Sequence, residues 1–259
     1  MSIEQIDEQD DDLGLSIITV CLNASSSIGQ NINSIKLFCE EYPNSEHIII
    51  DGNSSDDTLD TVKLLQHERL HWQSENDKGT YDAMNKGLNI ATKKYVLFIN
   101  ADDFLCDTRK LNETLKLFTE NSAIEIIFGD IDIVNSQGQI VRIYHTSKWF
   151  KHWMFLVGIA PPHPGTIYKR NSIGRMNGFD PDYKITGDFD LALRMSSFKN
   201  YIMSGNVFTK MQVGGLSSRG LQSYTTSTIE IARSLKNNNS HSWILSPLRL
   251  LIKYYYGKK

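Results

Sequence analysis

The chain has 259 residues, of which 40% are hydrophobic and 22% are charged, and its formal net charge is -3. A chain of this length can bury a large core, so we expect one main domain with room for a small appendage. Binding to a nucleic-acid backbone needs dense Lys and Arg. The net negative charge therefore argues against nucleic acid as a partner.

The N-terminal half alternates predicted strands with predicted helices. Residues 1–13 contain six acidic residues, all between 4 and 12, and are expected to be disordered. After them, β-branched runs predict strands, and apolar residues spaced three and four apart predict helices. We expect strands over 15–20, 47–50, 95–99 and 124–129, a short extended segment over 70–76, and helices over 27–41, 59–65, 81–91 and near 108–120. This order predicts an α/β, Rossmann-like domain in which helices flank a mainly parallel sheet.

The pattern changes after Gly129. Residues 131–135 and 140–144 predict a hairpin around the turn Asn135-Ser136-Gln137-Gly138. We therefore expect a nucleotide-binding half over 14–130 and a second half over 131–225 that is arranged around another substrate.

The C-terminal segment, residues 226–259, is basic and amphipathic. No acidic residue follows Glu230, whereas Lys and Arg alternate with Trp, Leu, Ile and Tyr. One interpretation places this segment on an anionic membrane surface, with its basic groups facing lipid phosphates. The other is a helix that packs on the domain and keeps a basic outer face.

The cysteines are Cys21, Cys39 and Cys106, an odd number without metal-ligand spacing. Each is expected to be a small buried apolar residue. No N-terminal segment has the basic, apolar and small-residue order of a signal peptide. We expect a cytoplasmic protein, peripheral on the inner face of the plasma membrane if the C-terminal segment binds lipid.

The segment Asn100-Ala101-Asp102-Asp103 directly follows the apolar run over 95–99. Two adjacent carboxylates at the end of a buried strand repel each other and lose hydration, so a positive group is expected beside them. Mg²⁺ or Mn²⁺ is the natural candidate, because these ions often use one or two protein carboxylates and leave positions for phosphates. The alternative is an acidic cap for the helix near Thr108.

Asp51 and Asp77 lie in two further polar segments at predicted strand ends. Each one alone is more typical of a turn or a helix cap. Together with Asp102 and Asp103 they would share one edge of a parallel sheet, where ligands bind. Because a carboxylate can accept the imide hydrogen of uracil or the amino and imino hydrogens of guanine, the group predicts a nucleotide site.

Four segments carry a family resemblance, and their order and spacing agree with it. They are IITVCLN (17–23), IDGNSSDDT (50–58), DKGTYDAMNKG (77–87) and FINADD (98–103). They resemble the inverting nucleotide-sugar transferases of glycosyltransferase family 2, which have the GT-A fold. The resemblance is strongest to the branch of bacterial colanic-acid and other surface-polysaccharide transferases, and it covers about residues 14–200.

The resemblance implies a metal-dependent transferase that moves a sugar from a nucleotide diphosphate, with a UDP-sugar favoured, to a glycan or lipid-linked acceptor in bacterial surface polysaccharide synthesis. It places Thr19, Asn23 and Asp51 around the nucleoside and Asp77 near the base and ribose. It places Asp103 on Mg²⁺ or Mn²⁺, with Asp102 beside it toward the ribose. Many members have a second Asp where this chain has Gly52, and that Asp often contacts the base.

Inverting transfer needs a base that deprotonates the acceptor hydroxyl. In the family this base is an Asp or Glu well after the metal motif. The resemblance therefore implies Asp188, with Asp190 as the fallback, although Asp188 could instead only cap a helix. The rigid segment Pro161-Pro162-His163-Pro164 makes His163 a candidate for contact with substrate, and a structural role is the alternative.

Two rival functions remain open. One is a nucleotide-sugar-binding subunit without turnover, which the combined presence of Asp102, Asp103 and Asp188 disfavours. The other is a sugar-phosphate nucleotidyltransferase. Enzymes of that class have a glycine-rich phosphate loop with Arg and Lys near the N-terminus, and residues 19–30 contain no such loop.

Overall fold

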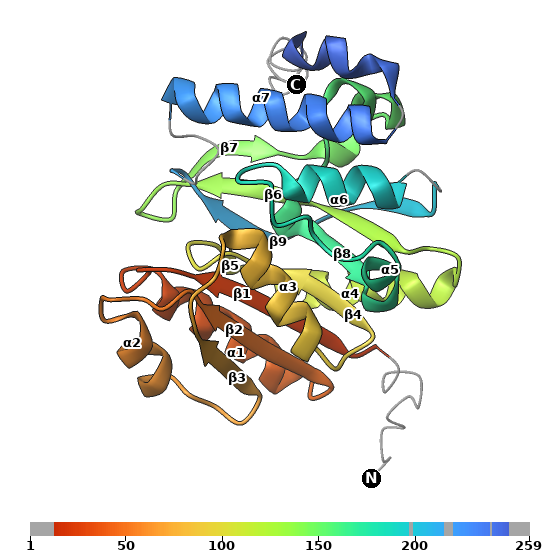
Figure 1. Cartoon of the computed structure of the whole chain (residues 1–259). Coiled ribbons are helices and arrows are strands. Elements are labelled where there is room, and N and C mark those ends of the chain that lie inside the picture. Colours follow the sequence, from red (N-terminus) through yellow and green to blue (C-terminus); the bar gives the residue numbers. More distant parts are fainter. Residues whose placement is uncertain (1–12, 197–198, 215–219, 239, 249–259) are drawn as a thin grey trace.

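The computed structural model describes residues 13–196, 199–214, 220–238 and 240–248 (Figure 1). The acidic tract before residue 13 and the basic residues after 248 lie outside this part of the chain. The expectations of a disordered N-terminus and of a basic tail on a membrane concern mainly those residues.

In the described part of the chain, nine strands form one sheet in the order β3-β2-β1-β4-β8-β6-β9-β5, with β7 paired to β6 beside this path. The strands are β1 (Leu15–Cys21), β2 (Ser45–Asp51), β3 (Leu70–Ser74), β4 (Tyr95–Phe98), β5 (Phe104–Leu105), β6 (Ile126–Val134), β7 (Ile140–Tyr144), β8 (Thr166–Lys169) and β9 (Tyr201–Gln212). Helices lie on both sides of the sheet, as expected for an α/β fold (Figure 1).

The helices begin and end close to the predicted positions in the first half. They are α1 (Ile28–Glu41), α2 (Thr58–Leu64), α3 (Thr80–Ile90), α4 (Thr108–Glu120), α5 (Arg170–Arg175), α6 (Gly187–Ser196) and α7 (Gly220–Asn237). Short 3₁₀ segments are η2 (Thr146–Lys148), η3 (His152–Val157), η4 (His163–Gly165) and η6 (His241–Leu248). Asp107 caps α4 by accepting a hydrogen bond from the Lys110 backbone N–H.

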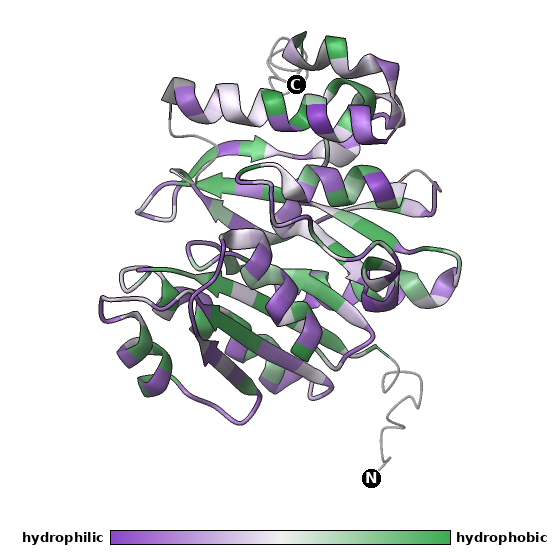
Figure 2. Ribbon diagram, in the orientation of Figure 1, coloured by the Kyte–Doolittle hydropathy of each residue, from purple (hydrophilic) through white to green (hydrophobic). Residues whose placement is uncertain are grey.

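The strands β3, β2, β1 and β4 are parallel to one another. Every residue of β1, β2 and β4 is buried, as expected for parallel strands that helices cover on both faces. Successive residues point to opposite faces, so Ile17 packs in the cluster with α1 and α4, and Ile18 packs in the cluster with α3 and α6. Figure 2 shows this apolar character along the strands.

The second half of the sheet is mixed. β8 runs antiparallel to both β4 and β6, while β9 pairs parallel to β6 and antiparallel to β5. The strands predicted over 124–129 and 131–135 are one continuous strand, β6, whose pairing with β9 shifts in register around Asp130. The sheet is therefore parallel in its first half rather than throughout.

The helix α7 packs on the domain. It contacts α6, and Ile231 and Leu235 are buried in the main apolar cluster. The segment η6 contacts α7 and η3. Among the helices of the described residues, none has the length and apolar character that a membrane crossing requires.

Candidate functional site

The carboxyl ends of the parallel strands bring the predicted donor residues to one edge of the sheet. Cys21 at the end of β1 pairs in register with Asp51 at the end of β2, and Asp51 pairs with Ser74 at the end of β3. The loop after β4 carries Asp102, and β4 is the neighbour of β1 on the side away from β2. The loops that contain Asn23, Asp51 and Asp102 therefore leave the sheet side by side.

Asp51 has no exposed surface, and its carboxylate is fully hydrogen-bonded. It accepts from the Ser54 backbone N–H at 3.0 Å, from the Ser54 hydroxyl and, at 2.6 Å, from the Ser74 hydroxyl. Burial raises the pKa of Asp51, but these hydrogen bonds outweigh burial and leave the pKa below its ordinary value. Asp51 is therefore a charged anchor that fixes the turn after β2.

Asp77 lies directly over Gly52. A Cβ atom at Gly52 would stand 2.5 Å from Asp77 Oδ2, which is closer than atoms can approach. Asp77 Oδ1 also accepts a hydrogen bond from the Gly79 backbone N–H at 2.8 Å. A side chain at position 52 would therefore have to displace the Asp77 carboxylate from its present position.

Thr19 has no exposed surface and faces the interior of the domain. Its hydroxyl donates to Asn31 Oδ1 at 3.1 Å and lies 3.0 Å from His47 Nε2. The Asn31 amide in turn donates to the carbonyls of Asn100 at 3.1 Å and Asp103 at 2.9 Å. Thr19 thus supports the loop that carries Asp102 through its hydrogen bond with Asn31. The Thr19 side chain itself is not accessible to a nucleoside.

Asn31 escapes sequence reasoning because α1 contains several polar residues, and only the structure shows that Asn31 is the one on its buried face. Asn23, by contrast, is exposed and adopts a left-handed conformation with φ of 51°. Its Oδ1 accepts from the Ser55 backbone N–H at 2.9 Å, and its own N–H donates to the Ser54 hydroxyl at 2.8 Å. Asn23 therefore links the loops after β1 and β2.

The structure distinguishes the two carboxylates of the acidic pair. Asp103 is 2% exposed, and its oxygens accept from the Gln212 backbone N–H at 3.1 Å and from the Asn100 amide at 3.4 Å. Burial, followed by the neighbouring charge of Asp102, raises the pKa of Asp103 well above its ordinary value. Asp102 is partly exposed and has no hydrogen bond or ion pair among the described residues.

This pair fits a divalent cation in one particular mode. Across the described residues, no three His, Cys, Asp or Glu side chains form a group that could enclose an ion. Mg²⁺ and Mn²⁺ do not need such an enclosure when phosphates supply the other ligands. The partly exposed carboxylate of Asp102, with the buried acid of Asp103 behind it, can bind an ion in this way. Of the two side chains, Asp102 is the more accessible to the ion.

The two candidate bases on α6 have different surroundings. Asp190 is buried, is paired with Arg194 Nε at 2.7 Å, and accepts from the hydroxyls of Ser234 at 2.7 Å and Tyr183 at 3.3 Å. Asp188 is partly exposed, and the Tyr81 hydroxyl lies 3.3 Å from its Oδ1. Asp190 is therefore engaged by the scaffold, whereas Asp188 keeps an accessible carboxylate.

Tyr81 lies on α3 and contacts the segment that carries Asp188. Its hydroxyl donates to the Ile185 carbonyl at 2.8 Å, and its ring stacks on Phe179 with centroids 5.6 Å apart. A Cβ at Gly187 would stand 2.8 Å from the ring, so only glycine allows α6 to begin this close to α3. Tyr81 lies within the DKGTYDAMNKG segment, but its contact with residues about 100 positions away could not be predicted from the motif.

His163 is 8% exposed and stacks on Phe98, with ring centroids 5.4 Å apart. Its Nδ1 lies 3.4 Å from the Tyr168 hydroxyl, and its Nε2 is buried without a hydrogen-bond partner in the described structure. Burial lowers its pKa, with a smaller opposing effect from the charge of Asp188. A neutral His with one buried, unpaired nitrogen therefore lies near Asp188 and packs against Phe98, the first residue of the FINADD segment.

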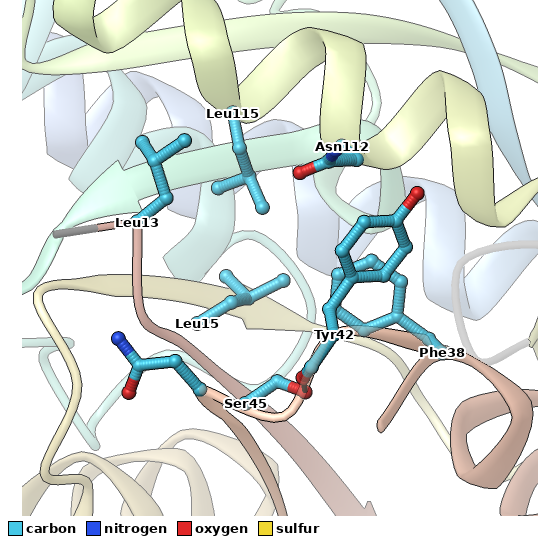
Figure 3. A pocket seen from close by; sticks show the side chains of 8 residues that line it. Leu13, Leu15, Phe38, Tyr42, Ser45, Asn112 and Leu115 are labelled. Carbon is cyan, nitrogen blue, oxygen red and sulfur yellow. Dashed lines mark hydrogen bonds between the residues drawn. The ribbon is translucent and has the colours of Figure 1, made fainter. Parts of the chain in front are cut away.

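A small pocket lies at the opposite edge of the sheet (Figure 3). Leu13, Leu15, Phe38, Tyr42 and Leu115 line most of it, and its volume is about 60 Å³. Leu15 begins β1, so this pocket is at the amino ends of the parallel strands. The pocket is too small for a nucleotide sugar and is separate from the carboxyl ends of the strands, where the predicted donor residues lie.

With these positions established, the family follows from comparison with known sequences. The family model described as glycosyl transferase family 2 matches residues 16–181. The chain belongs to this family. The matched range contains every predicted donor residue and His163, while Asp188 lies seven residues beyond it.

Relatives of this chain are also named as glycosyltransferases, and the protein is therefore a transferase enzyme. A PGL/p-HBAD biosynthesis glycosyltransferase of Mycobacterium bovis is 27% identical over 186 residues, which are 70% of this chain and 69% of the relative. The poly-beta-1,6-N-acetyl-D-glucosamine synthase of Staphylococcus epidermidis is 26% identical over 71% of this chain and 46% of the relative.

Solved structures confirm the GT-A-like α/β fold. The crystal structure of Staphylococcus aureus TarS 1–349 matches with a TM-score of 0.66 at 16% identity, covering 91% of this chain and 71% of that one. The mannosyltransferase PcManGT of Pyrobaculum calidifontis, in complex with GDP-Man and Mn²⁺, matches with a TM-score of 0.62 at 16% identity, covering 94% and 75%.

Proposed function

We propose that this glycosyltransferase is metal-dependent and inverting, and that it moves a sugar from a nucleotide diphosphate, with a UDP-sugar favoured, to a glycan or lipid-linked acceptor in bacterial surface polysaccharide synthesis. The observation that carries the proposal is the state of Asp102 and Asp188. Both carboxylates are partly exposed, and neither forms an ion pair with a described residue. Direct displacement needs a base for the acceptor hydroxyl and an acid or metal for the departing diphosphate, and Asp188 and Asp102 suit these two roles.

The donor nucleotide would bind along the loops after β1, β2 and β3. Asn23 and Asp77 offer polar groups there, while Asp51 and Thr19 hold the loops in shape. TarS has been solved with UDP and with UDP-GlcNAc, and PcManGT with GDP-Man. The space over Gly52 is taken by Asp77, so we assign base contact to Asp77 instead of a second Asp.

The resemblance implies Asp103 as the metal ligand, with Asp102 beside it toward the ribose. Because Asp103 is buried and already hydrogen-bonded, we propose instead that Asp102 holds the divalent cation together with the donor diphosphate, while Asp103 supports Asp102 from behind. A bound Mg²⁺ or Mn²⁺ supplies Lewis-acid stabilisation of the negative charge on the departing diphosphate. The complex of PcManGT with Mn²⁺ supports the choice of ion. Asn31 and Gln212 keep the loop in place through their bonds to Asp103.

Asp188 would take the proton from the acceptor hydroxyl as that oxygen attacks the sugar. Its partial exposure gives the hydroxyl access, and the Tyr81 hydroxyl orients the carboxylate. His163 is proposed as a substrate contact beside Asp188, because its Nε2 lacks a hydrogen-bond partner in the described structure, although this atom would first have to become accessible. The buried and paired Asp190 supports α6 and has no part in proton transfer.

The acceptor side would lie near the membrane surface. Large apolar side chains are exposed on η3 and on η6, two segments in contact with each other: Trp153, Leu156, Trp243, Ile244 and Leu248. Aromatic and aliphatic groups on η6, which the basic residues 249–259 follow in the sequence, suit an anionic bilayer. Vesicles of phosphatidylglycerol should therefore bind the full chain, and neutral phosphatidylcholine vesicles should bind it weakly.

The decisive experiment is thermal unfolding of the protein with UDP-, GDP- and dTDP-sugars, with Mn²⁺, with Mg²⁺ and with chelator. A donor that binds only the folded state raises the midpoint, by an amount that depends on its affinity. We expect a UDP-sugar to stabilise the protein only when metal is present. Stabilisation without any transfer to acceptor would favour a binding subunit, and no stabilisation by any nucleotide sugar would refute the proposal.

A further inference from the structure

Glu230 lies on α7, beyond the residues that the family model matches. It is 7% exposed, and its carboxylate accepts hydrogen bonds from three consecutive backbone N–H groups. The distances are 2.7 Å from Lys184, 3.0 Å from Ile185 and 2.9 Å from Thr186. The Thr186 hydroxyl adds a fourth bond at 3.1 Å. One side chain of α7 thus accepts hydrogen bonds from the backbone N–H groups of residues 184–186, the segment that leads into α6.

The charge of Glu230 suits these four donors. An ionised carboxylate has two acceptor oxygens and no hydrogen to donate, so four donors can converge on it. Hydrogen bonds to an ionised acceptor are about twice as strong as those between neutral groups. A Gln side chain of the same shape would turn an N–H₂ group toward one of these backbone N–H groups. The arrangement therefore depends on the carboxylate and not only on the size of the side chain.

Tyr81 holds the same segment from the other side. Its hydroxyl binds the Ile185 carbonyl at 2.8 Å, and its ring lies against Gly187. The segment over 184–187 is therefore clamped between α3 and α7. Asp188 follows immediately, with its Oδ1 3.3 Å from the Tyr81 hydroxyl.

We infer that Glu230 is a positioning residue for the Asp188 carboxylate, an inference that rests on the proposed function. By ordering residues 184–186, Glu230 determines where α6 begins and hence where Asp188 stands relative to Tyr81. A displacement of about 1 Å in a reacting group can cost about 10²-fold in rate. The donor-side carboxylates of Asp51 and Asp102 form no hydrogen bond with this segment, so Glu230 should affect kcat and leave donor affinity unchanged.

The test compares Glu230→Gln with Arg233→Gln, a matched control on the same helix. Arg233 pairs with Asp180 at 3.2 Å and with Asp182 at 3.6 Å, so it also attaches α7 to the preceding loop without touching residues 184–186. We expect Glu230→Gln to lower kcat about tenfold or more while KM for the donor changes less than about threefold. Arg233→Gln should change kcat less than about twofold.

A second measurement does not depend on activity. Hydrogen exchange of the peptide that covers residues 184–190 should be faster in Glu230→Gln than in the wild-type protein, because three of its amides lose an ionised acceptor. Exchange over 77–87 should stay unchanged. The control Arg233→Gln should leave exchange over 184–190 close to that of the wild-type protein.

Different results separate the inference from the proposed function. Active wild-type protein together with unchanged kcat in Glu230→Gln would overturn the inference and leave the function standing. Equal losses of kcat and of melting temperature in both variants would also overturn it, because general docking of α7 would then explain them. If the wild-type protein transfers no sugar but exchange over 184–190 rises in Glu230→Gln, the function fails and the ordering role of Glu230 stands.

Discussion

The two halves of the molecule secure their carboxylates in different ways. In the first half, Asp51 is held by Ser54, three residues away, and Asp77 by Gly79, two residues away. In the second half, Asp190 is held by Ser234, and Glu230 holds Thr186, in each case across 44 positions. The turns that carry Asp51 and Asp77 thus contain a hydrogen-bond partner of their own, although Ser74 also binds Asp51 and Gln212 binds Asp103 from farther along the chain. The base segment has its main anchor on α7, near the end of the described chain.

This contrast has a consequence for how the two halves respond to substitution. A turn that carries its own hydrogen-bond partners keeps its shape when remote residues change. A segment fixed by Tyr81 and Glu230 loses its shape when either helix moves. Substitutions in the second half should therefore affect the rate and stability together more often than substitutions in the first half.

The largest expected effect separates the two aspartates of α6. Asp188→Asn should lower kcat by about 10²-fold or more, because the general base is lost. Its melting temperature should stay near that of the wild-type protein, since Asp188 is partly exposed. Asp190→Asn should lower the melting temperature instead, because it breaks the buried pair with Arg194. Steady-state kinetics and calorimetry on both variants would show an exchange of these roles if our assignment were wrong.

The next effect concerns the acidic pair. Asp103→Asn should weaken metal binding or activity by about 10-fold to 100-fold, as expected for a residue that supports a ligand. Asp102→Asn should abolish the stabilisation that a donor gives in the presence of Mn²⁺. Titration of Mn²⁺ by calorimetry, with donor present, measures both. Wild-type metal affinity in Asp102→Asn would contradict the role of Asp102.

A smaller effect tests the contact between the halves. Gly187→Ala should destabilise the protein by about 1–3 kcal/mol, because the added Cβ meets the Tyr81 ring. Gly174→Ala is a suitable control, since a Cβ there meets nothing within 4 Å. Urea unfolding of both variants gives the difference, and equal stabilities would show that α3 and α6 are not packed this closely.

The smallest effect concerns a turn of the first half. Hydrogen bonds, of which the one from the Thr58 hydroxyl is the largest contribution, lower the pKa of Asp56 from 3.8 to about 2. A lowered pKa contributes stability that is present above pH 3.8 and is lost as the pH falls toward about 2. Thr58→Val should raise the pKa of Asp56 toward its ordinary value. NMR titration of the carboxyl carbon measures this shift, and an unchanged midpoint would contradict it.

The sequence predicted the first half of the fold well because each element there is continuous and regular. The strands over 15–20 and 47–50 are β-branched runs, and their helices have clear apolar spacing. The long strand β9 was not predicted, because Gly205 with Asn206 interrupts its β-forming pattern. β6 was predicted as two strands, since Gly129 and Asp130 are typical of a turn.

The candidate site shows the same limit. Asp51, Asp77 and Asp102 could be chosen from the sequence, because each lies in a motif that directly follows a strand. Asn31 and Glu230 could not, because their partners are the Asp103 carbonyl and the backbone N–H groups of residues 184–186. Sequence motifs do not record which side chain meets a distant backbone group.

By itself, the sequence determined the α/β order of the first half and the acidic residues at the strand ends, because these depend on local spacing and on the two-residue and 3.6-residue periods of strands and helices. The resemblance of four motifs indicated the family. The tertiary structure decided which carboxylates stay accessible. Asp102 and Asp188 remain partly exposed, whereas Asp103 and Asp190 are buried with hydrogen-bond partners. The physical reason is that burial and long-range hydrogen bonds arise only when β9 and α7 pack against loops that precede them by many residues.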